Sequence, residues 1–538
     1  MNRHDLQDLG GGTISGVLAS RASWAPDNPA LVFGGATTSY RELNDMTTAV
    51  AAGLIALGSE PGDVAAALMT NRTETLVSAY GGSRAGLVRV PINTAYKGPL
   101  LQHVLEHSES KILFMEASFG DALLTLPELP PTLKTIICLD GLPERMPAGQ
   151  FEMVSWEDML AARSEKPIFP EVGPQDIGSI GFTSGTTGRS KGVVSPNLQQ
   201  VMMARETAAA FGVSARDRMY TCMPLFHGMA SVTTCATALY AGATVLLSPR
   251  FSVSRFWDEV RDGKATQFNC LGSIMHMLLS LPPSDLDRQH HVERVFSAPA
   301  PPEVLYRFEQ RFGVHVIEGY GQTEIKNVLY NPVQGRKIGS MGLPTATTIM
   351  EVHDDQGNRC SPGEVGEMVY RPRQPDIMMK GYLKEPDKTL AGMRDLWWHT
   401  GDLASQDADG FFYFFDRKGD SLRRRGENIS SQELEGLLVG FPGVKDAAAV
   451  ATPSDVGEDE VLVVLEVQDP VGFDYEALRS HCTSTMPKFM IPRYFRLMTV
   501  LPRTPTGKIQ KAVLRKEGVT EDTWDAARAA DPPLPARI

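Results

Sequence analysis

A loop rich in glycine and hydroxyl side chains occupies residues 181–192, with the sequence Gly-Phe-Thr-Ser-Gly-Thr-Thr-Gly-Arg-Ser-Lys-Gly. It follows an apolar run, residues 177–182, that predicts a buried strand. Glycine lets backbone N–H groups turn toward an anion, hydroxyls add neutral donors, and lysine supplies a positive charge. The segment therefore predicts a phosphate-binding loop rather than a solvated linker. Its candidate contact residues are Thr183, Ser184, Gly185, Thr186, Thr187, Gly188 and Lys191.

The ordinary P-loop pattern, G-x-x-x-x-G-K-[ST], does not fit this loop. With four residues between it and Gly185, Ser190 stands where the second glycine is needed, and Gly192 follows Lys191 where a hydroxyl would reach magnesium. The loop instead resembles the phosphate loop of the adenylate-forming superfamily. That superfamily contains acyl-CoA synthetases, peptide-synthetase adenylation domains and firefly-type luciferases.

Length and composition indicate a soluble, multidomain, cytoplasmic protein. The 538 residues exceed what one core accommodates, so at least two domains are expected. No apolar run approaches the roughly 18 residues of a membrane span, and the N-terminus has no apolar signal core. The six cysteines lack C-x-x-C spacing and are expected to be reduced. A net charge of −12 argues against a nucleic-acid surface.

The elements that must position the loop follow a βα alternation. A capping box, Ser39 with Glu42, begins a predicted helix that Gly58 ends. We expect strands at residues 64–68, 88–91, 112–115, 135–139, 177–182, 243–247 and 294–297. This order predicts an α/β fold, in which a large domain of parallel-rich sheets is flanked by helices.

A further segment matches the superfamily beside a predicted acyl pocket. Residues 224–227, Pro-Leu-Phe-His, match a segment whose histidine borders that pocket, although a lone histidine is more often a satisfied core residue. Ala230 replaces the usual glycine, and no aspartate follows to meet an α-ammonium group, which disfavours an amino acid substrate. The resemblance implies an acyl pocket formed by His227, Met229, Asn269, Gly319 and Gly321.

Residues 318–324, Glu-Gly-Tyr-Gly-Gln-Thr-Glu, are interpreted as a glycine-spaced turn. Tyr320 offers a face for adenine, Thr323 a donor to phosphate, and Glu324 a hard oxygen ligand for magnesium. The match to the Y-G-x-T-E motif is specific, and residues 297–299 stand where the superfamily lines the adenine. The resemblance implies nucleotide contacts from Ala298, Pro299, Tyr320, Gly321 and Gln322.

A carboxylate and a basic run mark the expected domain boundary. Asp402, after glycine on a predicted tight turn, matches the T-G-D aspartate that accepts both ribose hydroxyls. Residues 417–425 carry a net charge of +4 and match the hinge, where Arg417 would contact the ribose. The pivot, usually Asp or Lys, is Gly419. We therefore expect domains at 1–417 and 418–538, with a hinge near 416–420.

The smaller domain is expected to be a mobile α+β lid. Helices are predicted at residues 431–438 and 475–484, and strands at 446–452 and 460–468. The P-x-T-x-x-G-K motif near the end implies that Lys508 is the catalytic lysine. The G-E-N-I turn, residues 426–429, implies coenzyme A contacts from Gly426 and Glu427. Charge alone adds Arg425, and with it Arg423 and Arg424, as candidates for the coenzyme A phosphates.

The resemblance covers nearly the whole chain and implies an acyl-CoA synthetase-like member of the superfamily. A carboxylic acid would react with ATP, Mg²⁺ and then coenzyme A through an acyl-adenylate, with Thr323, Glu324, His227 and Lys508 in the reaction site. We expect a short or medium-chain, aromatic or carnitine-like acid, and a monomer or homodimer. Loading of a separate carrier protein, a luciferase-type oxygenase and a non-catalytic nucleotide-binding regulator remain as alternatives.

Overall fold

The computed structural model describes residues 10–126, 128–147, 150–164, 166–183, 190–297, 302–417, 421–424, 427–454, 459–503 and 509–527. The chain divides into two compact units: residues 1–94, 100–182 and 192–418, and residues 95–99, 183–191 and 419–538. Several predicted site residues lie outside the described ranges: Ser184, Gly185, Thr186, Thr187, Gly188, Ala298, Pro299, Gly419, Arg425, Gly426 and Lys508.

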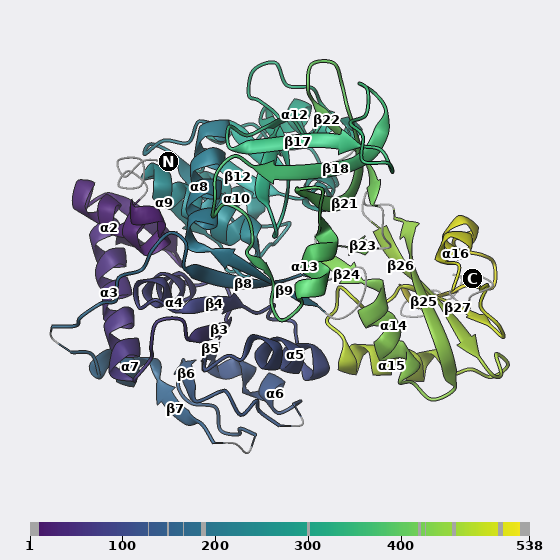
Figure 1. The fold of residues 1–538 in the computed structure, drawn as a ribbon, viewed down its shortest axis with the longest axis horizontal. Coiled ribbons are helices and arrows are strands. Elements are labelled where there is room, and N and C mark those ends of the chain that lie inside the picture. The colour runs from purple at the N-terminus through teal and green to yellow at the C-terminus, as the bar shows by residue number, and fades with distance from the viewer. Residues whose placement is uncertain are drawn as a thin grey trace. The chain divides into compact units, whose positions relative to one another are not determined.

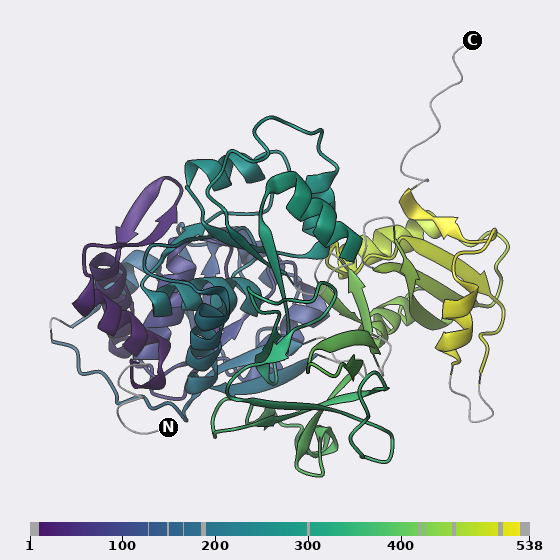
Figure 2. The ribbon, with the colours of Figure 1, turned by 90° about the horizontal axis from the view of Figure 1, so that it is seen from above.

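A nine-stranded sheet runs through the described part of the first unit. Its strands are, in spatial order, β16 (Leu343–Pro344), β15 (Lys326–Tyr330), β14 (His315–Gln322), β13 (Arg294–Ser297), β12 (Gln267–Cys270), β10 (Arg218–Thr221), β11 (Thr244–Leu247), β1 (Pro29–Phe33) and β2 (Ala36–Ser39). The strands from β14 to β1 pair in parallel, which confirms the parallel-rich prediction. Figure 2 shows the antiparallel β1–β2 hairpin, in purple, at the margin of this unit.

An eight-stranded sheet carries both ends of the predicted phosphate loop. Among the described residues its order is β19 (Gly381–Tyr382), β9 (Lys191–Pro196), β8 (Ile177–Thr183), β4 (Val88–Pro91), β3 (Val64–Leu68), β5 (Ile112–Glu116), β6 (Thr135–Leu139) and β7 (Glu152–Ser155). The strands predicted at 64–68, 88–91 and 135–139 are confirmed to the residue. Each is a short apolar run between turn residues, so its bounds can be predicted from the sequence.

Helices cover these sheets in the first unit (Figure 1). They are η1 (Gly10–Gly12), α2 (Ile14–Trp24), α3 (Tyr40–Ala56), α4 (Thr73–Arg84), α5 (Gly98–Ser108), η2 (Ala117–Phe119), α6 (Gly120–Leu123), α7 (Trp156–Ala161), α8 (Asn197–Phe211), η3 (Met229–Ala236), α9 (Thr237–Ala241), α10 (Phe256–Asp262), α11 (Gly272–Leu279), α12 (Pro302–Phe312) and α13 (Pro386–Gly392). The capping box that begins α3 is confirmed, because the Glu42 N–H donates to Ser39 Oγ at 3.2 Å and the Ser39 N–H donates to Glu42 Oε2 at 2.7 Å. Among the described residues, no helix is both long and apolar enough to cross a membrane.

A third, antiparallel sheet of the first unit was not predicted. It comprises β17 (Thr348–His353), β18 (Val365–Pro372), β21 (Trp397–Gln406) and β20 (Met393–Arg394), with β22 (Phe412–Arg417) paired to β21. Two segments interpreted as turns prove to be mainly strand, because β14 continues to Gln322 and β21 runs through Asp402. Their glycines had indicated turns, but each segment pairs with the strand that follows it in the chain, Gln322 with Lys326 of β15 and Asp402 with Arg417 of β22.

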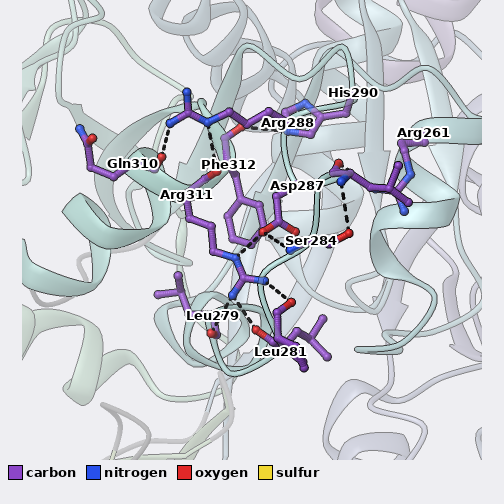
Figure 3. A network of polar contacts seen from close by, with 12 residues as sticks. Arg261, Leu279, Leu281, Ser284, Asp287, Arg288, His290, Gln310, Arg311 and Phe312 are labelled. Carbon is purple, nitrogen blue, oxygen red and sulfur yellow. Dashed lines mark hydrogen bonds and ion pairs between the residues drawn. The ribbon is translucent and has the colours of Figure 1, made fainter.

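The loop between α11 and β13 is anchored by arginines to α12 (Figure 3). The Arg311 guanidinium donates to Asp287 at 2.7 Å and to the carbonyls of Leu279 and Leu281 at 2.9 and 2.7 Å. The imidazole of His290 uses both nitrogens, one against the Phe312 carbonyl at 3.0 Å and one accepting from the Val292 N–H at 3.1 Å. These bonds satisfy the backbone groups of the loop that leads into β13.

The second unit is a small α+β assembly, as predicted. It contains the β23 (Ser421–Arg424) and β24 (Glu427–Ser430) pair, and the sheet β25 (Val444–Pro453), β26 (Asp459–Val467), β27 (Tyr494–Met498) and β28 (Trp524–Asp525). Its helices are α14 (Ser431–Val439), α15 (Tyr475–Thr485) and α16 (Lys511–Glu517). Apolar side chains of β25 and β26, among them Val450 and Leu462, pack with Leu514 of α16 to form its core.

Candidate functional site

The base of the predicted phosphate loop is the part that the structure describes. Strand β8 ends at Thr183 and β9 begins at Lys191, and between them the Ser190 hydroxyl donates to the Thr183 carbonyl at 3.0 Å. Earlier in β8, a Cβ on Gly181 would lie 3.0 Å from the Thr323 methyl group. Glycine therefore allows the strand that enters the loop to approach Thr323 closely.

Two predicted nucleotide residues, Tyr320 and Gln322, donate to the buried carboxylate of a third, Asp402. Asp402, of β21, is 1% exposed, and its Oδ2 accepts a hydrogen bond of 2.6 Å from the hydroxyl of Tyr320. The same oxygen accepts from Gln322 Nε2 at 2.8 Å. Gln322 Nε2 also donates to the Thr400 carbonyl at 2.9 Å, which ties the end of β14 to β21. Asp402 is thereby fixed in position as an acceptor.

The backbone of Arg417 lies next to that of Asp402. Strands β21 and β22 pair so that Arg417 is opposite Asp402. The side chain of Arg417 lies outside the described part of the chain, so its role stays a prediction.

Glu324 occupies the turn between β14 and β15 and is held at both ends. Its Oε1 accepts from the Tyr382 hydroxyl at 2.8 Å, and its carbonyl accepts from the Met379 N–H at 2.8 Å. Burial raises the pKa of the Tyr382 hydroxyl well above its usual value, and the Glu324 charge raises it further, so Tyr382 remains a donor. Tyr382 itself is placed by the pairing of β19 with β9.

The residues present fit a magnesium ion bound mainly through substrate. Among the described residues, no group of three or more His, Cys, Asp or Glu side chains is arranged to hold a metal ion. Mg²⁺ commonly takes one or two carboxylates, with phosphates and water as its other ligands. The single carboxylate of Glu324 matches that pattern.

Gln199 of α8 is a site residue that sequence reasoning missed. Its Nε2 donates to the Thr323 carbonyl at 3.1 Å and lies 3.4 Å from the Glu324 carbonyl. The side chain is 4% exposed, and α8 directly follows β9. A glutamine inside a helix carries no sequence signal for such a contact, since its partners are backbone atoms more than 100 residues away.

A buried ion pair joins α8 to β15 beside this turn. Lys326 Nζ pairs with Glu206 Oε2, and the lysine side chain is fully buried. Glu206 also accepts from the Thr347 N–H at 3.3 Å. Burial lowers the pKa of Lys326, whereas the Glu206 carboxylate opposes that shift. Residues 324–326 are therefore anchored to α8 by a charge pair as well as by Gln199.

The predicted acyl-pocket residues are partly brought together. Asn269 is buried, and its Nδ2 donates to the Met229 carbonyl at 2.7 Å, whereas its Oδ1 has no hydrogen-bond partner among the described residues. A Cβ on Gly319 would lie 2.8 Å from the Phe296 ring, and one on Gly321 would lie 2.4 Å from the Lys326 carbonyl. Both glycines are thus required by close packing. His227 begins the turn into η3, where its carbonyl accepts from the Ser231 N–H at 3.0 Å.

Arg424, in the basic run of residues 417–425, has a structural contact in place of the predicted coenzyme A contact. Arg424 is buried in the second unit, where its Nε pairs with Glu460 at 2.6 Å and its Nη1 donates to the Ile491 carbonyl at 2.6 Å. The prediction that Arg424 meets coenzyme A phosphates is therefore wrong, because its guanidinium is already used within this unit. Glu427 begins β24, opposite Arg424.

Comparisons with known proteins match this arrangement over nearly the whole chain. A family model described as AMP-binding enzyme matches residues 18–383, and one described as AMP-binding enzyme C-terminal domain matches residues 433–508. The chain is 30% identical over 518 residues to a crotonobetaine/carnitine–CoA ligase of Salmonella typhi, covering 94% of this chain and 99% of that protein. It is 32% identical over 519 residues to a sulfoacetate–CoA ligase of Cupriavidus necator, with 93% and 97% covered.

Solved structures agree in fold. An o-succinylbenzoate CoA synthetase from Bacillus subtilis superposes with a TM-score of 0.81 at 24% identity, covering 93% of this chain and 98% of that one. An anthranilate CoA ligase superposes with a TM-score of 0.70 at 25% identity, with 94% and 97% covered. With the family model spanning residues 18–383, the chain belongs to the AMP-binding enzyme family.

Proposed function

We propose that this enzyme is an AMP-forming acid–CoA ligase, which converts a carboxylic acid, ATP and coenzyme A to acyl-CoA, AMP and pyrophosphate. The observation that carries the proposal is the fixed Asp402 carboxylate, which Tyr320 and Gln322 hold at 2.6 and 2.8 Å, in a chain that also holds Glu324 in place. The similarity to two CoA ligases along more than nine tenths of the chain supports it.

In the first half-reaction the carboxylate oxygen of the acid attacks the α-phosphorus of ATP, and the bond to pyrophosphate breaks. Asp402, with Arg417, would bind the ribose, while the loop from Thr183 to Lys191 would hold the phosphates. Mg²⁺ bound through Glu324 would neutralise phosphate charge. Positioning and electrostatic stabilisation then account for most of the rate, as in other phosphoryl chemistry, and no protein nucleophile is needed.

Lys508 would bridge the carboxylate and the α-phosphate, because two anions must approach each other. In the second half-reaction the coenzyme A thiol attacks the acyl carbon and displaces AMP. A rotation at Gly419 would withdraw Lys508 and bring the turn of Arg425, Gly426 and Glu427 to the thiol. Glycine at the pivot leaves the backbone free to adopt both orientations.

For the acid we propose a short carboxylic acid that bears a second polar or charged group. The Asn269 Oδ1 is a buried acceptor without a described partner, which favours a donor on the bound acid. The similar proteins are named for carnitine, crotonobetaine and sulfoacetate, which are small acids with a second charged group. Of these three, only carnitine carries a hydroxyl that could donate to Asn269.

The test is pyrophosphate release with ATP and Mg²⁺ over carnitine, crotonobetaine, sulfoacetate, benzoate and straight-chain fatty acids, each with and without coenzyme A. We expect sustained turnover with one small polar acid only when coenzyme A is present. A single burst of pyrophosphate that coenzyme A does not sustain would indicate transfer of the acyl group to a carrier protein. If no acid gave pyrophosphate release, the alternative of a non-catalytic nucleotide-binding regulator would be favoured.

A matched pair of lysine variants tests the catalytic assignment. Lys508→Ala should lower acid-dependent pyrophosphate release by about a hundredfold or more, in the range seen when one charged transition-state contact is removed. Lys516→Ala, on the exposed side of α16, should retain the activity. Equal activity of both variants would overturn the role of Lys508.

A further inference from the structure

Arg89 is a charged side chain of β4 that the proposed chemistry does not use. Its one hydrogen bond among the described residues runs from Nη2 to the Leu225 carbonyl at 3.3 Å. No described carboxylate forms an ion pair with it, and the ionisable groups close to it are Tyr80 and Cys235, which are neutral at pH 7. Burial lowers the pKa of Arg89, yet a guanidinium stays charged in proteins.

The side chain of Arg89 lines a cavity of about 30 Å³ in the first unit. None of the lining residues is acidic; most are apolar, such as Phe114 and Phe226. The two hydroxyls in the lining already donate to backbone carbonyls, from Thr75 to Thr70 at 2.7 Å and from Ser78 to Thr75 at 3.1 Å. The guanidinium is therefore the positive group of an otherwise apolar chamber.

Arg89 is half-buried, and a charge with restricted access to water and neither a counter-charge nor a full set of hydrogen bonds is unfavourable. Arginine offers five N–H donors, of which one is used here. A cavity needs about 10–15 Å³ of this kind of volume for one water molecule, so this cavity has room for a monatomic anion. We propose that the Arg89 cavity is a binding site for one small monovalent anion of the halide class, with chloride as its ligand.

The site lies against the turn that carries His227. The Leu225 carbonyl accepts from Arg89, and the Leu225 N–H donates to Asn71 Oδ1 at 2.8 Å. Asn71 Nδ2 in turn donates to the Met223 carbonyl at 2.9 Å. Residues 223–227 are thus held by one buried amide and one guanidinium. An anion that fixes Arg89 consequently fixes this turn.

The experiment compares chloride and bromide with gluconate at constant ionic strength, using the full-length protein. Because an anion that binds only the native state raises stability by mass action, the melting temperature should rise by about 1–3 °C with saturating halide. Crystals grown in bromide should show an anomalous peak against the Arg89 guanidinium. Neither readout depends on the acid–CoA ligase proposal.

Three variants complete the test. Arg89→Met should abolish the halide response, Arg89→Lys should retain a weaker one, and Arg84→Met should retain it fully. Arg84 is a suitable control because it bonds Asn44 at 2.7 Å and lies outside the cavity lining. Ordered water without a bromide peak in the wild-type cavity would overturn the proposal, even if Arg89→Met failed to fold. So would an equal halide shift in wild type and Arg89→Met.

Discussion

The hydroxyl of Tyr320 donates a hydrogen bond of 2.6 Å to Oδ2 of Asp402, across 82 residues of sequence and from one sheet to another. Tyr320 was predicted to offer its ring to adenine and Asp402 to accept ribose hydroxyls. The contact between them joins the two roles, because the tyrosine that would stack on the base also orients the carboxylate that would bind the sugar.

Tyr320→Phe should therefore impair ATP binding although the ring is retained. Losing one hydrogen bond to a charged group costs about 1.5–3 kcal/mol, so the KM for ATP should rise about tenfold or more. Tyr370→Phe is the matched control, since the Tyr370 hydroxyl is buried without a described partner. Steady-state kinetics with varied ATP measure both, and an unchanged KM in Tyr320→Phe would contradict the role given to this contact.

Tyr382→Phe should alter the magnesium requirement. The Tyr382 hydroxyl orients Glu324 Oε1 at 2.8 Å, and loss of a hydrogen bond to a metal-ligating group typically weakens metal affinity 10- to 100-fold. We expect the Mg²⁺ concentration for half-maximal pyrophosphate release to rise about tenfold, with activity recovered at high Mg²⁺. Glu324→Gln should not be recovered in this way. Failure of excess Mg²⁺ to restore Tyr382→Phe would argue that the tyrosine acts otherwise.

Lys326→Met should destabilise the protein strongly, because it leaves the Glu206 carboxylate buried and without its cation. Breaking a buried pair in this way costs about 3–5 kcal/mol, whereas replacing both partners by apolar residues is often nearly neutral. The double variant Lys326→Met with Glu206→Leu should thus recover much of the free energy of unfolding, measured by urea denaturation. Equal losses in the single and double variants would show that the pair itself is stabilising.

His290 should make stability depend on pH. Burial lowers its pKa from the usual 6.5, and protonation would break the bond that its ring nitrogen accepts from the Val292 N–H. Below pH 6.5 the unfolded chain therefore binds a proton that the folded chain resists, so the free energy of unfolding falls as the pH drops toward the lowered value. One such group contributes at most about 1.4 kcal/mol per pH unit.

Urea denaturation between pH 7.5 and 5 measures this dependence. His290→Gln should give a flatter profile than wild type, and the exposed His291→Gln should match wild type. His315, whose pKa burial also lowers, would account for a remaining slope. Identical profiles for wild type and His290→Gln would rule out this contribution.

Local patterns predicted much of the fold. Strand β3 at residues 64–68 and helix α3 after Ser39 could be predicted because apolar runs and a capping box are local signals. The strand through Asp402 could not, since its glycine indicated a turn, whereas pairing with β18 and with the following strand β22 keeps the backbone extended.

The same distinction holds for the candidate site. Tyr320, Glu324 and Asp402 could be named because the motifs that contain them are contiguous, whereas Gln199 acts only through carbonyls brought to it by the fold. Arg424 is the opposite case, because the sequence indicated a coenzyme A contact that the fold does not leave available. A run of arginines indicates an anion site only when their guanidinium groups are free, and its pairing with Glu460 depends on a strand 36 residues away.

The ion pair between Arg424 and Glu460 also determines where a fragment that contains only the second unit should begin. The family model of the C-terminal domain begins at residue 433, yet Arg424 and Glu460 are both largely buried within this unit. A fragment that starts at 433 would lose β23 and β24 and leave the Glu460 carboxylate without its guanidinium. Recombinant expression of the second unit alone should therefore begin before Ser421, near residue 419.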